Sequence, residues 1–194
     1  MRKGSPAFRA NRLALAILVC LLLPELGLSQ QGAFDLAGKP ANPFDAASGK
    51  IVVLVFLRRD CPVSSRYAPI IQQISALHER DASFWLVFPD KAETPQTIHN
   101  YLHEYAYHLP ALRDPEHALV KLAQVQITPE VAVFNRNHQL LYDGRIDNWY
   151  LDLGRSRPAP TTHELADAIQ AALAGKAPAV TQVRGVGCYI SDLE

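Results

Sequence analysis

One cysteine, Cys61, lies where an apolar run gives way to a helical pattern. The run covers residues 51–57, and Pro62 begins an amphipathic stretch directly after the cysteine. A thiol at the start of a helix meets unpaired backbone N–H groups and the positive end of the helix dipole, and both stabilise the thiolate. The neighbouring carboxylate of Asp60 acts in the opposite direction. Because the thiolate is the nucleophilic form, we predict thiol chemistry at Cys61.

A second cysteine, Cys188, lies near the end of the chain, and the third, Cys20, falls in an N-terminal apolar stretch. Cys61 and Cys188 are far apart in sequence, so their contact cannot be deduced from it. They could form a redox pair, a permanent bridge or two unrelated thiols. Gly187 precedes Cys188 in a tail, residues 176–194, that has no clear periodicity. We expect Cys188 to resolve oxidised Cys61 if this tail folds back.

Residues 1–29 have the features of a secretory signal peptide: a basic start, an apolar stretch over 13–23 and small residues near a cleavage site. The apolar stretch is short for a membrane anchor. We therefore predict a periplasmic or otherwise exported protein with no stable membrane insertion after cleavage. This segment holds four of the 19 basic and one of the 19 acidic residues, so about three negative charges remain on the rest. No basic stripe is left, which argues against a nucleic-acid partner.

The rest of the chain alternates between strand and helix patterns. The apolar run 51–57 is typical of a buried parallel strand, and the hairpin composition of 135–138 indicates two antiparallel strands beside it. We therefore expect an α/β domain with a mixed central sheet and helices on both faces. Strands are expected at 34–36, 51–57, 83–88, 130–134 and 139–142. Helices are expected at 62–79 with a kink at Pro69, at 94–105, at 114–124, and at 161–175 with a capping box of Thr161 and Glu164.

This order of elements, with a cysteine at the helix that follows the first long strand, resembles the thioredoxin fold. Thioredoxins carry Cys-x-x-Cys followed by Ala-Pro-Ile, and here Cys61-Pro-Val-Ser64 is followed by Ala68-Pro69-Ile70 at the same offset. They also have a cis-proline directly before the hairpin strands, which Thr128-Pro129 matches. The resemblance covers residues 34–175 and implies a thioredoxin-like redoxin domain. It also implies that Thr128 and Pro129 hold a substrate backbone beside Cys61.

The departures from that pattern concern the chemistry. The second cysteine of the motif is Ser64, and Val55 stands where thioredoxins have a buried acid. The number of residues between Cys61 and Pro129 is closer to larger redoxins of the AhpC/TSA type, yet Leu54 stands where the proline of their signature would be. The whole chain resembles bacterial exported redoxin-domain proteins.

The resemblance implies a thiol-dependent oxidoreductase with Cys61 as the nucleophile and no organic cofactor. Its partners would be protein disulfides or hydroperoxides, together with an external thiol reductant. The alternative is a binding or metal-chaperone module of the Sco-like kind. That alternative lacks a ligand, because Ser65 stands at the position of the second cysteine in the Sco-like motif. His99 and His103 share a helix face, but nothing completes a metal site there, so we predict none.

Overall fold

The computed structural model describes residue 1, residues 32–191 and residue 193. The chain divides into two units, Met1–Gln30 and Gln31–Glu194, and the second is described here. The predicted signal peptide and Cys20 lie outside the described residues.

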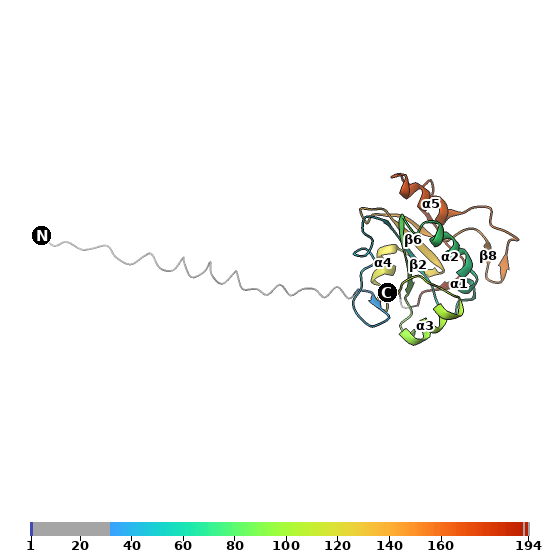
Figure 1. Ribbon diagram of the computed structural model, residues 1–194, viewed down its shortest axis with the longest axis horizontal. Helices are drawn as coiled ribbons and strands as arrows, with labels where there is room; N and C mark the ends of the chain where they lie inside the picture. The colour runs from blue at the N-terminus through green and yellow to red at the C-terminus, as the bar shows by residue number, and fades with distance from the viewer. Residues whose placement is uncertain (2–31, 192, 194) are drawn as a thin grey trace. The chain divides into compact units, whose positions relative to one another are not determined.

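A mixed seven-stranded sheet forms the centre of the domain (Figure 1). Its middle strand is β2 (Ile51–Phe56), which pairs in parallel with β3 (Ala82–Phe88) and antiparallel with β6 (Glu130–Phe134). All six residues of β2 are buried, as expected for a strand covered on both faces. The order across the sheet is β1 (Phe34–Asp35), β4 (Ala111–Arg113), β3, β2, β6, β7 (Leu140–Gly144) and β10 (Gln182–Val183).

Helices cover both faces of this sheet, as predicted (Figure 1). Alternate residues of β2 belong to two separate core clusters because successive side chains of a strand point to opposite faces. One cluster takes side chains from α1 (Pro62–Arg66), α2 (Ala68–Leu77), α3 (Pro95–Glu104) and α5 (Glu164–Leu173). The other takes side chains from α4 (Ala118–Ala123) and from Ile190 of the tail.

The stretch predicted as one kinked helix is two helices, α1 and α2, which meet at Tyr67. Pro69 explains the break, since proline has no N–H to donate and its ring crowds the carbonyl four residues earlier. Because of the break, the helix that begins after Cys61 is short, and α2 is a separate helix.

Two predicted helix starts are wrong. Residues 114–117 form a turn before α4: the buried Asp114 accepts a hydrogen bond from Val120 N at 2.9 Å, and His117 adopts a left-handed conformation. The last helix has no capping box, because its N-cap is His163 and the carboxylate of Glu164 binds Arg145 instead. Asp114 still binds the first turn of α4, although the helix begins later than predicted. At α5, by contrast, the contact with Arg145 takes the carboxylate that the local sequence assigns to the cap.

The tail contains two short strands that its sequence pattern does not predict. β10 adds in parallel to β7, and β11 (Cys188–Tyr189) pairs antiparallel with β5 (Ile127–Thr128), the segment just before Pro129. The approach of β10 requires a glycine at position 144, where φ is +137° and a Cβ would lie 2.0 Å from the Val183 carbonyl oxygen. A further hairpin, β8 (Tyr150–Asp152) with β9 (Arg155–Ser156), extends from the body of the domain (Figure 1).

Candidate active site

Cys61 is the N-cap residue of α1, on the turn that leaves β2. Its backbone N–H donates to the Arg58 carbonyl, and its own carbonyl accepts from Ser65 N, so the turn holds the residue from both sides. The side chain is fully buried, at 0% exposure. The predicted place at a strand-to-helix junction is therefore confirmed, but the thiol is covered rather than open to solvent.

The peptide bond between Thr128 and Pro129 is cis, as predicted. Thr128 lies against the cysteine: the Sγ atom of Cys61 donates to the Thr128 carbonyl oxygen at 3.1 Å. The loop that ends at Pro129 and the start of α1 thus meet, although 67 positions separate the two residues that touch.

The tail brings Cys188 onto the same face. In the pairing of β11 with β5, Cys188 stands opposite Thr128, and the Thr128 hydroxyl donates to the Cys188 carbonyl oxygen at 3.3 Å. Both cysteines are free thiols, with Cys61 buried and Cys188 partly exposed. The structure therefore brings together all four residues that the sequence singles out: Cys61, Thr128, Pro129 and Cys188.

The two thiols have opposite tendencies to ionise. Burial raises the pKa of Cys61, but hydrogen bonds from the Ser64 amide, the Cys188 thiol, the Ser64 hydroxyl and the Val63 amide together lower it below its ordinary value. Burial, followed by the hydrogen bond to Cys61 and the charge of its thiolate, raises the pKa of Cys188 to about 11. Cys61 therefore ionises more readily than Cys188, and Cys188 is the thiol that donates to it when Cys61 is ionised.

Arg58 and Glu130 hold the tail over the cysteine, and sequence reasoning did not select either. Arg58 Nη1 donates to the Tyr189 carbonyl oxygen at 3.1 Å, and its Nη2 pairs with Asp60 at 2.9 Å. Glu130 is 2% exposed and accepts hydrogen bonds from three backbone N–H groups, those of Gln126, Ile127 and Gly185. A signal for Glu130 was present in the sequence, because a carboxylate inside the apolar strand 130–134 needs partners.

Glu93 places a buried carboxyl beside the loop that carries Cys61. Its Oε1 accepts from Arg59 N at 2.9 Å, while no partner for its Oε2 is found among the described residues. Burial raises the pKa of Glu93, and the hydrogen bond from the Arg59 amide lowers it. The negative charges of Asp90 and Asp60 also raise this pKa, and the net shift is upward. This chain has Val55 at the position where thioredoxins have a buried acid. Its own buried acid, Glu93, lies instead on the connection between β3 and α3.

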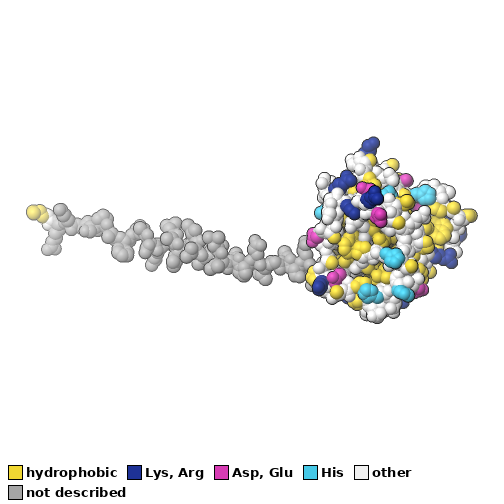
Figure 2. All heavy atoms as spheres, viewed as in Figure 1, with side chains coloured by type: hydrophobic (Ala, Val, Ile, Leu, Met, Phe, Trp, Pro, Cys, Tyr) yellow, Lys and Arg dark blue, Asp and Glu magenta, His cyan; other side chains and the backbone are white. Residues whose placement is uncertain are grey.

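The predicted histidine pair lies on an exposed face of α3, where His99 and His103 both face solvent. Within residues 32–191 no group of three or more His, Cys, Asp or Glu side chains is arranged to hold a metal ion. No helix in the described part of the chain is long and apolar enough to cross a membrane. On the face shown in Figure 2, basic and acidic side chains are interspersed.

A family model described as thioredoxin-like matches residues 49–140, the stretch from the start of β2 to the start of β7. The chain has a thioredoxin-like fold. The thioredoxin-like match ends before the tail, so Cys188 and the strands β10 and β11 lie outside it. No curated protein matches the chain.

Solved structures share the thioredoxin-like fold at low sequence identity. A hypothetical protein from Sinorhizobium meliloti 1021 has a TM-score of 0.67 and 21% identity, covering 81% of this chain and 88% of its own. An uncharacterised conserved protein from Geobacillus kaustophilus has a TM-score of 0.67 and 20% identity, covering 82% and 86%. A secreted Mycobacterium tuberculosis disulfide oxidoreductase, described as homologous to DsbE of E. coli, has a TM-score of 0.50 and 17% identity, covering 74% and 93%.

Proposed function

We propose that this thioredoxin-like protein is an exported thiol-disulfide oxidoreductase whose redox pair is Cys61 and Cys188. The observation that carries the proposal is the register of β11 on β5, which sets Cys188 opposite Thr128 while the Thr128 carbonyl accepts from Cys61. The fold is shared with the secreted disulfide oxidoreductase from M. tuberculosis. Export rests on the features of residues 1–29.

In the reductive direction, the Cys61 thiolate attacks one sulfur of a partner disulfide. A bond forms between Cys61 and that sulfur, and the partner's other sulfur leaves as a thiolate and takes a proton. Cys188 then loses its proton and attacks the Cys61 sulfur, which forms the Cys61–Cys188 disulfide and releases the partner as a dithiol. An external thiol reductant returns the pair to the dithiol state, and the same steps in reverse oxidise a partner.

The pKa values order these two steps. While Cys61 is a thiolate, its hydrogen bond and its charge help to hold the pKa of Cys188 near 11, so Cys188 keeps its proton. Once Cys61 is bonded to the partner sulfur, that negative charge is gone. Cys188 then ionises more easily, at the stage when a second nucleophile is needed.

A hydroperoxide is the second candidate substrate, favoured by the complete burial of Cys61, which a small molecule can reach more easily than a folded partner. The Cys61 thiolate would attack the nearer peroxide oxygen, giving a sulfenic acid and releasing water or an alcohol after proton transfer. Cys188 would then condense with the sulfenic acid to give the same disulfide and a molecule of water.

The test uses the full-length chain with Cys20→Ser, so that Cys61 and Cys188 are the only cysteines. The reduced protein is treated in separate reactions with insulin, as a protein disulfide, and with hydrogen peroxide, and is mapped by non-reducing digestion and mass spectrometry. We expect a peptide that joins Cys61 to Cys188. In a Cys188→Ser variant we expect instead a mixed disulfide on Cys61 with insulin, or a sulfenic or sulfinic acid on Cys61 with peroxide. Absence of the joined peptide with both oxidants would refute the redox pair, and the faster oxidant identifies the substrate class.

A further inference from the structure

The tail strand β11 lies along β5 as a separate peptide would. Beside the β-pairing, Ile190 N donates to the Gln126 carbonyl at 2.9 Å, and Gly185 N donates to Glu130 Oε1 at 2.9 Å. The segment 185–190, which bends at residues 186–187, therefore lies along β5 and over Cys61. The site that it occupies, bounded by β5 and Cys61, is called the groove below. With this segment in place Cys61 has no exposed surface.

The position before the tail cysteine admits only glycine. A Cβ built on Gly187 would lie 2.0 Å from the Thr128 carbonyl oxygen, 2.7 Å from the Thr128 carbonyl carbon and 3.2 Å from Cδ of Pro129. Two of these atoms are backbone atoms, next to the cis bond, so no flexible side chain can move aside to make room. Any segment that binds in the register of the tail meets the same restriction.

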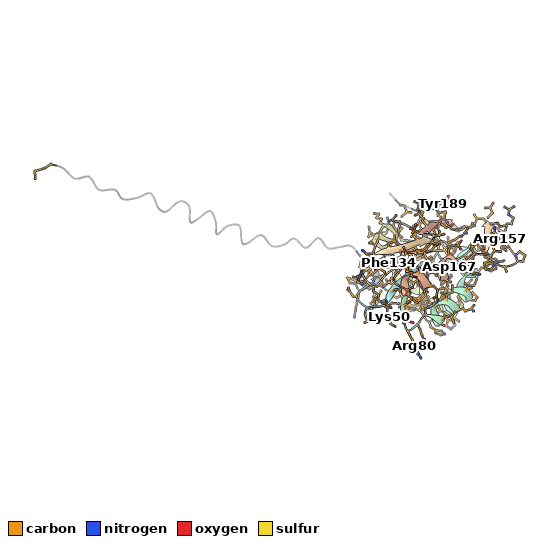
Figure 3. All side chains as sticks on the ribbon, turned by 90° about the horizontal axis from the view of Figure 1, so that it is seen from above. Lys50, Arg80, Phe134, Arg157, Asp167 and Tyr189 are labelled. Atoms are coloured by element: carbon orange, nitrogen blue, oxygen red, sulfur yellow. The ribbon has the colours of Figure 1, made fainter. Side chains whose placement is uncertain are left out.

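The two positions after the cysteine make different demands. The Tyr189 side chain is 76% exposed and points outward at the surface of the domain (Figure 3), while its carbonyl binds Arg58. Ile190 is 5% exposed and packs into the core cluster that includes α4. The groove therefore requires an aliphatic side chain two residues after the cysteine. It places no requirement on the side chain of the residue directly after the cysteine.

We infer that this groove binds extended segments of partner proteins with the sequence Gly–Cys–x–aliphatic, and that the tail of this chain is its built-in occupant. The inference rests on the proposed function, because the partner cysteine is the one that exchanges with Cys61. Tail and partner occupy the groove in turn: the tail leaves, the partner cysteine bonds to Cys61, and the returning tail brings Cys188 to release it.

The test uses synthetic peptides whose single cysteine carries a thionitrobenzoate group through a disulfide. Cys61 attacks the peptide sulfur, the Cys61–peptide disulfide forms, and coloured thionitrobenzoate leaves as the thiolate, so its release reports the rate. The protein is the full-length chain with Cys20→Ser and Cys188→Ser, which has one reactive thiol. The peptides contain Gly-Cys-Tyr-Ile, Ala-Cys-Tyr-Ile, Gly-Cys-Tyr-Ser or, as the matched control, Gly-Cys-Ala-Ile.

We expect the Ala-Cys and Tyr-Ser peptides to react at least about tenfold more slowly than the Gly-Cys-Tyr-Ile peptide, and the control peptide to react within about twofold of it. Adding Ile190→Ser to the protein should loosen the tail and speed reaction with every peptide. Equal rates for all four peptides would overturn the inference and leave the proposed function intact. No reaction with any peptide, while iodoacetamide still alkylates Cys61, would overturn the proposed function itself.

Discussion

Replacing Glu130 with glutamine tests whether this buried carboxylate holds the active face together. Oε2 accepts from Gln126 N at 3.0 Å and from Ile127 N at 3.3 Å, and Oε1 accepts from Gly185 N at 2.9 Å. The first two bonds shape the approach to the cis bond, and the third ties down the tail. Glutamine has nearly the same shape, so Glu130→Gln changes hydrogen bonding without opening a cavity.

The magnitude follows from counting acceptors. A glutamine has one amide oxygen, and its NH₂ end faces a backbone N–H whichever way the amide turns. At least one buried N–H therefore loses its acceptor, which costs about 1–3 kcal/mol, and the remaining bonds lose the strength that the negative charge provides. We expect the free energy of unfolding to fall by about 2–4 kcal/mol, a large part of the 5–15 kcal/mol typical of a domain.

Urea denaturation followed by circular dichroism measures this free energy, with Glu104→Gln as the control because Glu104 lies exposed on α3. The control should stay within about 0.5 kcal/mol of the wild type. A second measurement is the alkylation rate of Cys188, which should rise in Glu130→Gln if the amide nitrogen turns toward Gly185. A loss below about 0.5 kcal/mol for Glu130→Gln would refute the reasoning, because the three bonds would then contribute nothing to stability.

Three further changes test the electrostatics of the site. In Cys61→Ser, alkylation of Cys188 against pH should show a pKa below about 11, since the hydrogen bond to the Cys61 thiol and the charge of its thiolate are removed. An unchanged pKa would show that Cys61 does not influence the ionisation of Cys188. Glu93 has a raised pKa, so the stability tied to its protonated form is lost as pH rises through that pKa. The unfolding free energy of Glu93→Gln should therefore gain on the wild type in urea titrations as pH rises above the ordinary glutamate pKa of about 4.3, and a constant difference would contradict this. Ser64→Cys should form a disulfide with Cys61 and raise insulin reduction, and a folded variant without that gain would show that the groove excludes such substrates.

The central part of the fold was predictable because its signals are local and strong. The apolar run of β2 marks a covered strand, Pro62 marks a helix start, and Thr94 with Thr97 forms the cap at the predicted start of α3. Cys61 and Thr128-Pro129 were identified from the same kind of signal. Each is a short motif whose position in the chain fixes its position at the edge of the sheet.

The tail was not predictable in the same way. β10 and β11 have two residues each, too few for any hydrophobic period, and both depend on partners far away in sequence. The meeting of Cys188 with Cys61 follows from that pairing. The residue in the sequence that best indicates this contact is Gly187. The reason for a glycine there is known only from the structure, because it depends on the position of the Thr128 carbonyl. The start of α5 shifted because Glu164 pairs with Arg145 rather than forming a capping box. The start of α4 shifted because residues 114–117 form a turn, from which Asp114 binds the first turn of the helix.

The separate attachment of β10 and β11 has a consequence for solubility. An open edge of a β-sheet offers unpaired N–H and C=O groups on which a second chain can add and begin aggregation. Here β10 covers the β7 edge through the close approach that Gly144 permits, whereas β11 lies on a different sheet. The segment 185–190 can thus come away from Cys61 while residues 182–183 stay in place. The reactive thiol would then be uncovered by opening the short β5 edge alone, while the β7 edge of the central sheet stays covered by β10.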